Sequence, residues 1–269
     1  MEAAELNTFE EFERKAKAVL EDHEKKRQAR RGYFSPVLFR GQARASWELS
    51  TSLERYSTRP YSPGDYYKVV CNVRPAVESC TGKRWPFPDE YPGKDRGLPA
   101  GPKGYEFMVY LRHHGFPSPL LDWTQSFYVA AFFAFQSSKA ADPDDPDVAI
   151  YALREYCGRG KSGWANEATI GSLGPYMTTD KRHVTQQCEC TFCRKESGDR
   201  YLYCSHEEAF KRDERDQDVL LKFTIPRAER RKVLDELRMM NITAYSLFGG
   251  EESLMATLAY QEIESREFR

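Results

Sequence analysis

Apolar residues recur at helical spacing close to the start of the chain. Between residues 7 and 29 they fall on one stripe, and Thr8 and Glu11 have the spacing of a capping box. This pattern predicts an amphipathic helix that begins after Thr8. Similar patterns predict further helices over residues 62–80, 105–114, 126–136, 226–240 and 251–263.

Short runs of apolar residues, some of them alternating with polar ones, predict the strands. These runs lie at residues 36–41, 120–121, 148–153, 183–193 and 219–225. Because the strands are concentrated between helical segments, the sequence predicts an α+β fold. We expect an N-terminal amphipathic helix over residues 1–32 and a larger domain over residues 33–269.

The composition excludes several classes of protein. The 269 residues include 40 basic and 41 acidic side chains, and this balance excludes a wholly basic nucleic-acid coat but not a local basic groove. An aromatic content of 13% is too high for a disordered chain. We find no signal peptide and no apolar run of membrane-spanning length, so the expectation is a cytoplasmic protein with no membrane partner.

The seven cysteines are read as free thiols or metal ligands, because their number is odd and the chain has the character of a cytosolic protein. Five residues have a spacing that invites a zinc interpretation: Cys188, Cys190, Cys193, Cys204 and His206. The final Cys-x-His pair is too tightly spaced for the usual zinc knuckle. Since cysteine packs readily in protein cores, buried free thiols are favoured and no metal ligand is assigned.

Residues 81–104 are rich in proline and glycine and predict a long loop. Basic and aromatic residues alternate within it: Lys83, Arg84, Trp85, Phe87, Tyr91, Lys94 and Arg96. Such a mixture can stack on bases and pair with phosphates. An ordinary surface loop explains the same composition equally well.

Two motifs make a family resemblance visible. Phe39-Arg40-Gly41-Gln42 and the longer run His113-His-Gly-Phe-Pro-Ser-Pro-Leu-Leu-Asp-Trp-Thr124 resemble motifs of the FRG domain family. The chain departs from the family pattern at Arg112, where the family has Gln, and at Pro119, where it has Arg. Weaker matches at Arg182, Gln186-Gln187 and Leu247-Phe-Gly-Gly250 extend the resemblance to about residues 36–260.

The layout of the FRG domain is in turn similar to that of ADP-ribosyltransferases. Those enzymes place an arginine or histidine on a first strand, a hydroxyl motif on a second strand before a helix, and a glutamate on a third strand. The resemblance implies an α+β fold with a split mixed or antiparallel sheet surrounded by helices. It also implies NAD as a substrate.

The resemblance assigns the catalytic role to Glu189 and Gln187. Loss of nicotinamide from NAD builds positive charge on the ribose, and a carboxylate bonded to the ribose 2′-hydroxyl stabilises that charge. Glu189 is the candidate for this carboxylate. Gln187 would share its strand face, since side chains alternate along a strand, and would reach the acceptor.

The resemblance also implies a set of NAD-binding residues. Arg40 would pair with the pyrophosphate or an adenosine-side hydroxyl as a multi-donor fork. Thr124 or Ser126 would orient the nicotinamide ribose, and Phe127 or Tyr128 would stack on the nicotinamide ring. Simpler interpretations stay open, namely an ion pair between Arg40 and Asp122 and an N-cap role for Thr124.

The sequence therefore predicts an ADP-ribosyltransferase that moves ADP-ribose from NAD to a macromolecule. The basic residues slightly favour a nucleic acid, RNA in particular, over protein as the acceptor. Bacterial proteins with this resemblance look like toxins or anti-phage defence effectors, and a toxin would need an antitoxin as partner. The alternative is a non-catalytic FRG recognition module, stabilised by zinc, that binds RNA or a protein.

Overall fold

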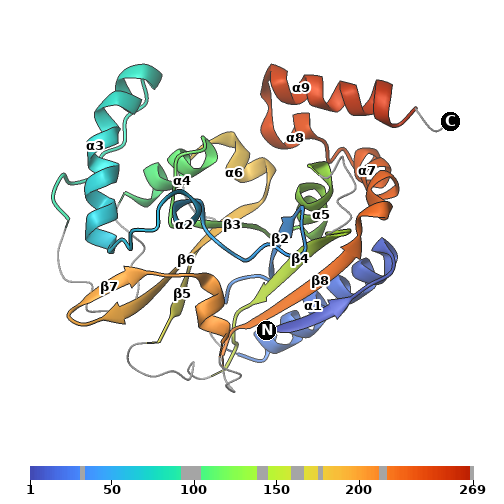
Figure 1. Ribbon diagram of the computed structural model, residues 1–269, viewed down its shortest axis with the longest axis horizontal. Coiled ribbons are helices and arrows are strands. Elements are labelled where there is room, and N and C mark those ends of the chain that lie inside the picture. The colour runs from blue at the N-terminus through green and yellow to red at the C-terminus, as the bar shows by residue number, and fades with distance from the viewer. Residues whose placement is uncertain are drawn as a thin grey trace.

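The computed structural model describes residues 1–30, 34–91, 104–137, 145–158, 167–174, 178–211 and 217–266. Over these residues the protein has an α+β fold, as the sequence predicts, with helices packed around one mixed sheet (Figure 1). Among the described helices, none has an apolar stretch long enough to cross a bilayer.

The described strands form one eight-stranded sheet. In chain order they are β1 (Glu2–Glu5), β2 (Leu38–Gln42), β3 (Leu121–Thr124), β4 (Asp147–Arg154), β5 (Thr169–Leu173), β6 (Cys188–Ser197), β7 (Arg200–Tyr203) and β8 (Val219–Pro226). Across the sheet the order is β1-β8-β4-β2-β3-β6-β5, and β7 also pairs with β6. β1 runs parallel to β8, whereas the other described pairs are antiparallel.

Helices flank both halves of this sheet. They are α1 (Phe9–Gln28), α2 (Ser52–Tyr56), α3 (Pro63–Thr81), α4 (Tyr105–His113), α5 (Phe127–Gln136), α6 (Lys181–Thr185), α7 (Arg230–Met239), α8 (Ala244–Phe248) and α9 (Gly250–Ala259). Short 3₁₀ turns cover His206–Phe210 and Arg227–Glu229, and a π-helical turn covers Tyr260–Glu264. In Figure 1, α3 and α4 lie on the side of β6 and β7, while α5, α7, α8 and α9 lie on the side of β4 and β8.

The predicted helices are confirmed to within a few residues. The capping residues that predicted their starts form the expected hydrogen bonds. Thr8 accepts a hydrogen bond from the backbone N–H of Glu11, and Ser62 accepts one from Asp65. The prediction of a strand over 183–193 is wrong in its first part. The side chain of Asp180 caps α6 there, and β6 begins only at Cys188.

β2 and β3 separate soon after they meet. Phe39 and Thr124 are the one residue pair in register between them, whereas β2 and β4 share five such pairs among the described residues. Next to this pair, Nη1 of Arg40 donates a hydrogen bond to the backbone carbonyl of Asp122 at 2.7 Å. The sheet is therefore split at the point where the arginine of the Phe-Arg-Gly motif lies.

The main core lies between α1, α5, α7 and strands β2, β4 and β8. Phe9 and Phe12 of α1 pack against Phe135 and Phe127 of α5, with ring centroids 6.5 Å and 5.9 Å apart. The N-terminal helix therefore shares its hydrophobic core with the central helix of the larger domain.

A second core lies under α3 and α4, and it includes aromatic residues of the predicted loop. Trp85 is buried, and its ring centroid is 4.8 Å from that of Phe107 and 4.7 Å from that of Tyr110. Phe87 packs on Phe107, and the guanidinium of Arg74 lies 4.2 Å from the centroid of the Phe87 ring. These two rings are occupied within the protein, so the expected base stacking by Trp85 and Phe87 is not available. Lys94 and Arg96 lie outside the described residues.

We expect Gly41→Ala to destabilise the protein by about 3 kcal/mol, near the upper end of overpacking costs. A Cβ atom at this position would lie 1.9 Å from the backbone oxygen of Ala130 and 2.6 Å from the backbone nitrogen of Ala134. Backbone atoms of α5 cannot move aside without shifting the helix. Chemical denaturation with urea measures the change in unfolding free energy.

Gly64→Ala is the matched control, since the same atom added there comes no closer than 3.5 Å to the ring of Tyr91 and 3.9 Å to the hydroxyl of Ser62, which are ordinary van der Waals contacts. Alanine is also the better helix former, so the control should be neutral or slightly stabilising. Equal losses of stability in the two variants would contradict the close packing of β2 on α5.

A chain of buried hydrogen bonds lies on the face of the sheet that is turned away from α5. Nε1 of Trp123 donates to the hydroxyl of Thr191 at 2.8 Å, and this hydroxyl lies 2.8 Å from Nε2 of His206. His206 is fully buried, and its pKa is lowered from 6.5 to about 3 by burial and by the nearby charge of Arg40. The folded protein therefore keeps this imidazole neutral.

Below pH 6.5 the unfolded chain protonates His206 while the folded protein resists protonation until about pH 3. The stability should therefore fall with decreasing pH across this window, and His206 should contribute about 1.4 kcal/mol per pH unit to the slope. In His206→Gln this part of the slope should disappear, as measured by urea unfolding between about pH 4 and pH 6. An unchanged slope would mean that His206 is protonated in the folded protein.

Candidate functional site

A cavity of about 830 Å³ opens where β2 and β3 separate. Its walls come from β2 and the segment that follows it, from the ends of α4 and α5, from β3, and from α6 and the end of α8. Its charged lining residues are four arginines and two carboxylates: Arg40, Arg55, Arg112, Arg182, Glu48 and Asp122. The excess of guanidinium groups makes the cavity suited to an anion.

Arg40 lies at the split between β2 and β3 and is partly buried. Its Nη1 is bonded to Asp122 O, but its buried Nε has no hydrogen-bond partner among the described residues. Burial, together with the positive charges of Arg112 and Arg55, lowers the pKa of Arg40 to about 10 against the opposing effect of Asp122. A negatively charged ligand would relieve this repulsion.

Asp122 is held by a different arginine from the one that the sequence suggested. Its Oδ2 lies 2.9 Å from Nη2 of Arg112, whereas Arg40 bonds only to its backbone. Burial alone would raise the pKa of the Asp122 carboxyl, but the charges of Arg112, His113 and Arg40 lower it below its usual value. Arg112, which departs from the FRG pattern, thus contributes both a cavity charge and the partner of this carboxylate.

The rim of the cavity carries an exposed aromatic ring. Trp47 is 51% exposed, and the guanidinium of Arg44 lies 5.9 Å from the centroid of its ring. The carbonyl of Trp47 accepts a hydrogen bond from the hydroxyl of Tyr151, which anchors the backbone there. Trp47 therefore offers a flat apolar surface beside the cavity, where a base or another planar ring can stack.

Arg40 and Thr124 both line the cavity. The hydroxyl of Thr124 donates to the backbone carbonyl of Gln186 at 2.7 Å and accepts from the backbone N–H of Ser126 at 3.1 Å. Ser126, and not Thr124, is the N-cap of α5, because its hydroxyl accepts from the N–H of Val129. Ser126 is not among the described residues that line the cavity.

Phe127 and Tyr128 lie away from the cavity, in the core shared with α1. The ring of Phe127 packs on those of Phe12 and Phe39, and the hydroxyl of Tyr128 donates to Glu13 at 2.6 Å. Both rings are directed toward α1 because they lie on the core-facing side of α5. This placement does not fit the stacking on nicotinamide that the resemblance implied.

Glu189 lies on β6 directly opposite Trp123, a residue that lines the cavity. Its carboxyl is buried, and one oxygen accepts from the side-chain amide of Gln125 at 2.6 Å. The other oxygen has no hydrogen-bond partner among the described residues. Burial raises the pKa of Glu189 to about 7, against the lowering effect of Gln125. Glu189 itself is not one of the described cavity-lining residues.

Gln187 has a different environment from the one expected. It precedes β6, its side chain is exposed, and its φ angle of 47° lies in the left-handed region. The alternation of side chains along a strand therefore does not fix its direction relative to Glu189. Its carbonyl accepts a hydrogen bond from the backbone of Gln125, which connects it to β3.

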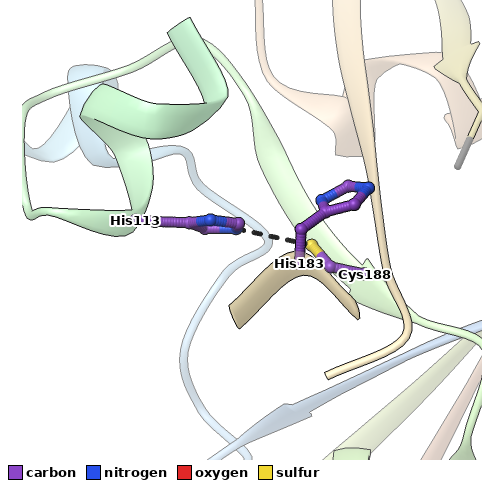
Figure 2. Close-up of side chains that lie close together, drawn as sticks. All are labelled: His113, His183 and Cys188. Atoms are coloured by element: carbon purple, nitrogen blue, oxygen red, sulfur yellow. Dashed lines mark hydrogen bonds between the residues drawn. The ribbon is translucent and has the colours of Figure 1, made fainter. Parts of the chain in front are cut away.

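The structure separates the cysteines of the zinc-like spacing, Cys188 to Cys204, into two groups. Cys193 and Cys204 approach each other, with their sulfur atoms 3.5 Å apart, while His206 bonds to Thr191. Cys188 instead lies in the cavity wall, with its Sγ 3.7 Å from Nε2 of His113 (Figure 2). The pKa of Cys188 is lowered by a hydrogen bond from the thiol of Cys190 and by the nearby histidines.

Several cavity residues were not assigned to the site from the sequence. Arg112 and His113 end α4, Arg182 lies on α6, and Phe248 ends α8. Arg182 joins these elements, since it donates to the carbonyls of His113 and Phe248, each at 3.1 Å. The weak matches at Arg182 and Leu247-Phe-Gly-Gly250 were the available signal, and a shared hydrogen-bond network accounts for them.

The comparison with known families agrees with the motifs that surround this cavity. Residues 35–143 match the model of the FRG domain, a range that contains both the Phe39-Arg40-Gly41 motif and the motif from His113 to Thr124. No curated protein and no solved structure matches the chain significantly. The segment that supplies β2, α4, β3 and α5 to the cavity, residues 35–143, thus matches the FRG domain family.

Proposed function

We propose that this protein transfers ADP-ribose from NAD to a macromolecule, with RNA favoured as the acceptor. The observation that carries the proposal is the adjacency of β2, β3 and β6 in the sheet. β2 and β3 carry Arg40 and Thr124 in the lining of one basic cavity, and β6 carries Glu189 opposite the lining residue Trp123. An arginine, a hydroxyl and a carboxylate in this order are the groups expected to hold NAD.

The size and charge of the cavity suit a dinucleotide. Its volume of about 830 Å³ lies within the range of small-molecule sites. The pyrophosphate of NAD would take the place between Arg40 and Arg55, where like charges now face each other. Trp47, rather than Phe127 or Tyr128, offers the ring for stacking on a planar group of the ligand.

The proposed reaction breaks the bond between ribose C1′ and the nicotinamide nitrogen. Nicotinamide leaves with the electron pair, the acceptor nucleophile forms a new bond to C1′, and its proton passes to a base or to solvent. The role of Glu189 is to bond the ribose 2′-hydroxyl as positive charge develops on the ring. One carboxyl oxygen of Glu189 accepts from Gln125, and the other, which has no partner among the described residues, would accept from the 2′-hydroxyl.

The rim of the cavity favours RNA as the acceptor. Trp47 with Arg44 at the cavity rim supports a base-containing acceptor, which keeps RNA ahead of protein. The basic end of α1 lends less support, because Lys26 and Arg27 form ion pairs with Asp22 and Glu24. Such a transfer would make the protein toxic to a host or a phage, and an antitoxin would be its partner.

One observation favours the alternative, a non-catalytic recognition module. Glu189 is buried and bonded to Gln125, and it does not line the cavity among the described residues. Incubation with NAD labelled in the adenylate part, together with separate pools of RNA, DNA and protein, distinguishes the two functions. A labelled pool supports transfer and identifies the acceptor, whereas intact NAD and no labelled pool would support recognition.

Arg55→Ala should weaken the binding of NAD about tenfold, because a charge-assisted hydrogen bond contributes on the order of 1.5 kcal/mol or more. Arg55 is exposed at the cavity, so its removal should not affect folding. Isothermal titration calorimetry measures the affinity. Arg59→Ala removes the same charge from an exposed site above the ring of Tyr61, outside the cavity lining, and should leave the affinity nearly unchanged.

Glu189→Gln should reduce ADP-ribose transfer about a hundredfold or more, while binding of NAD persists. The amide keeps the size of the side chain and a hydrogen bond to Gln125 but loses the negative charge. The labelled-NAD assay measures the loss. Glu196→Gln, which makes the same change farther along β6, is the control and should transfer normally. Normal transfer by Glu189→Gln would remove Glu189 from the mechanism.

A further inference from the structure

Three potential metal ligands meet at the wall of the cavity. His113 comes from the end of α4, His183 from α6, and Cys188 from the start of β6 (Figure 2). Their ligand atoms all lie within 4.8 Å of one another, and Nε2 of His113 is 3.7 Å from Sγ of Cys188. Three separate elements thus bring two imidazoles and one thiol close together, and His113 lies far in sequence from the other two residues.

The polar atoms of this cluster are poorly satisfied by the protein. His183 is 3% exposed, and neither of its ring nitrogens has a hydrogen-bond partner among the described residues. Nδ1 of His113 is buried and has none either. Burying an imidazole without partners costs free energy, and native proteins rarely do so without a bound ion or ligand.

We infer that His113, His183 and Cys188 bind a zinc ion. Zinc–nitrogen and zinc–sulfur bonds of about 2.0 and 2.3 Å at a tetrahedral angle place the two ligand atoms about 3.5 Å apart. The separation of 3.7 Å between His113 and Cys188 fits this geometry. The contact with His183 needs only a small approach, because its nitrogen is already within 4.8 Å of the other ligand atoms.

The competing sets of ligands in the chain are less suitable. Cys193 and Cys204 contact each other, and His206 is engaged with Thr191, so the spacing noted in the sequence does not produce one site. Asp122 and Cys190 lie near Cys188, but both oxygens of Asp122 are engaged, Oδ1 by the thiol of Cys190 and Oδ2 by Arg112. Asp122 therefore supports the site electrostatically without being a ligand.

A set of three protein ligands leaves one tetrahedral position open. His113 and Cys188 line the cavity, so this position faces the space between the arginines. The open position takes a water molecule or an anionic oxygen of a cavity ligand. The inference stands apart from the proposed transfer of ADP-ribose, because a bound zinc ion would serve a recognition site equally well.

The test is metal analysis of the purified full chain. We expect equimolar zinc in the protein, a rise in melting temperature when zinc is returned after chelation, and a thiolate-to-metal charge-transfer band after cobalt replaces zinc. The band reports a sulfur ligand without any activity assay. Absence of zinc, combined with no change in melting temperature on zinc addition, would overturn the inference.

Variants identify which residues bind the ion. Cys188→Ser should lose the charge-transfer band. His183→Gln should weaken zinc binding at least tenfold, because losing even a residue that hydrogen-bonds a ligand costs about 10- to 100-fold. Cys193→Ser is the matched control and should keep both zinc and the band. Circular dichroism verifies that each variant is folded. Binding that survives in Cys188→Ser but is lost in Cys193→Ser would move the site to the other pair of cysteines and overturn the assignment.

Discussion

A buried arginine at the split in the sheet determines how the rest of the site is arranged. Arg40 cannot lose its proton under ordinary conditions, so its charge has to be compensated where it is buried. The backbone carbonyl of Asp122 accepts one of its hydrogen bonds, and the Asp122 carboxylate is close enough to oppose the effect of burial on its pKa. This contact bridges β2 and β3 where the strands no longer pair, and the space beyond it is the cavity.

The neighbouring glycine, Gly41, allows the side of β2 that faces away from the cavity to pack tightly against α5. Because Gly41 has no Cβ, the backbone of α5 approaches β2 more closely than another residue would permit. The same five-residue strand therefore presents a tightly packed face to α5 and a charged group to the cavity. The Phe-Arg-Gly motif has a separate physical reason at each position, with Phe39 in the core, Arg40 at the split and Gly41 under the helix.

The cavity collects groups whose energies depend on one another. Arg182 links α4 to α8 through two carbonyls, and this positions His113 beside Cys188. Arg112 forms an ion pair with Asp122. The remaining arginines of the cavity, Arg40 and Arg55 among them, therefore outnumber the remaining carboxylates. A site with this excess of positive charge, a thiol, and two imidazoles whose ring nitrogens are not all paired among the described residues is better suited to binding an ion or nucleotide than to structural support alone.

The sequence alone determined the long helices, the central strands and the motif that surrounds the cavity. Periodicity and capping residues such as Thr8 and Ser62 are local signals, because the hydrogen bonds that they form join residues only a few positions apart. The short strands β1, β5 and β7 had no such signal, because their pairing depends on partners distant in the chain.

Only the tertiary structure decided which chemical groups meet. Spacing along the chain grouped Cys188 with Cys193, Cys204 and His206, yet the pleat of β6 and the short helix α6 place Cys188 with His113 and His183 instead. Likewise, Phe127 follows the hydroxyl motif directly in sequence, but its position on α5 directs its ring into the core. Side-chain direction depends on which face of an element is covered, and packing between distant segments determines that face.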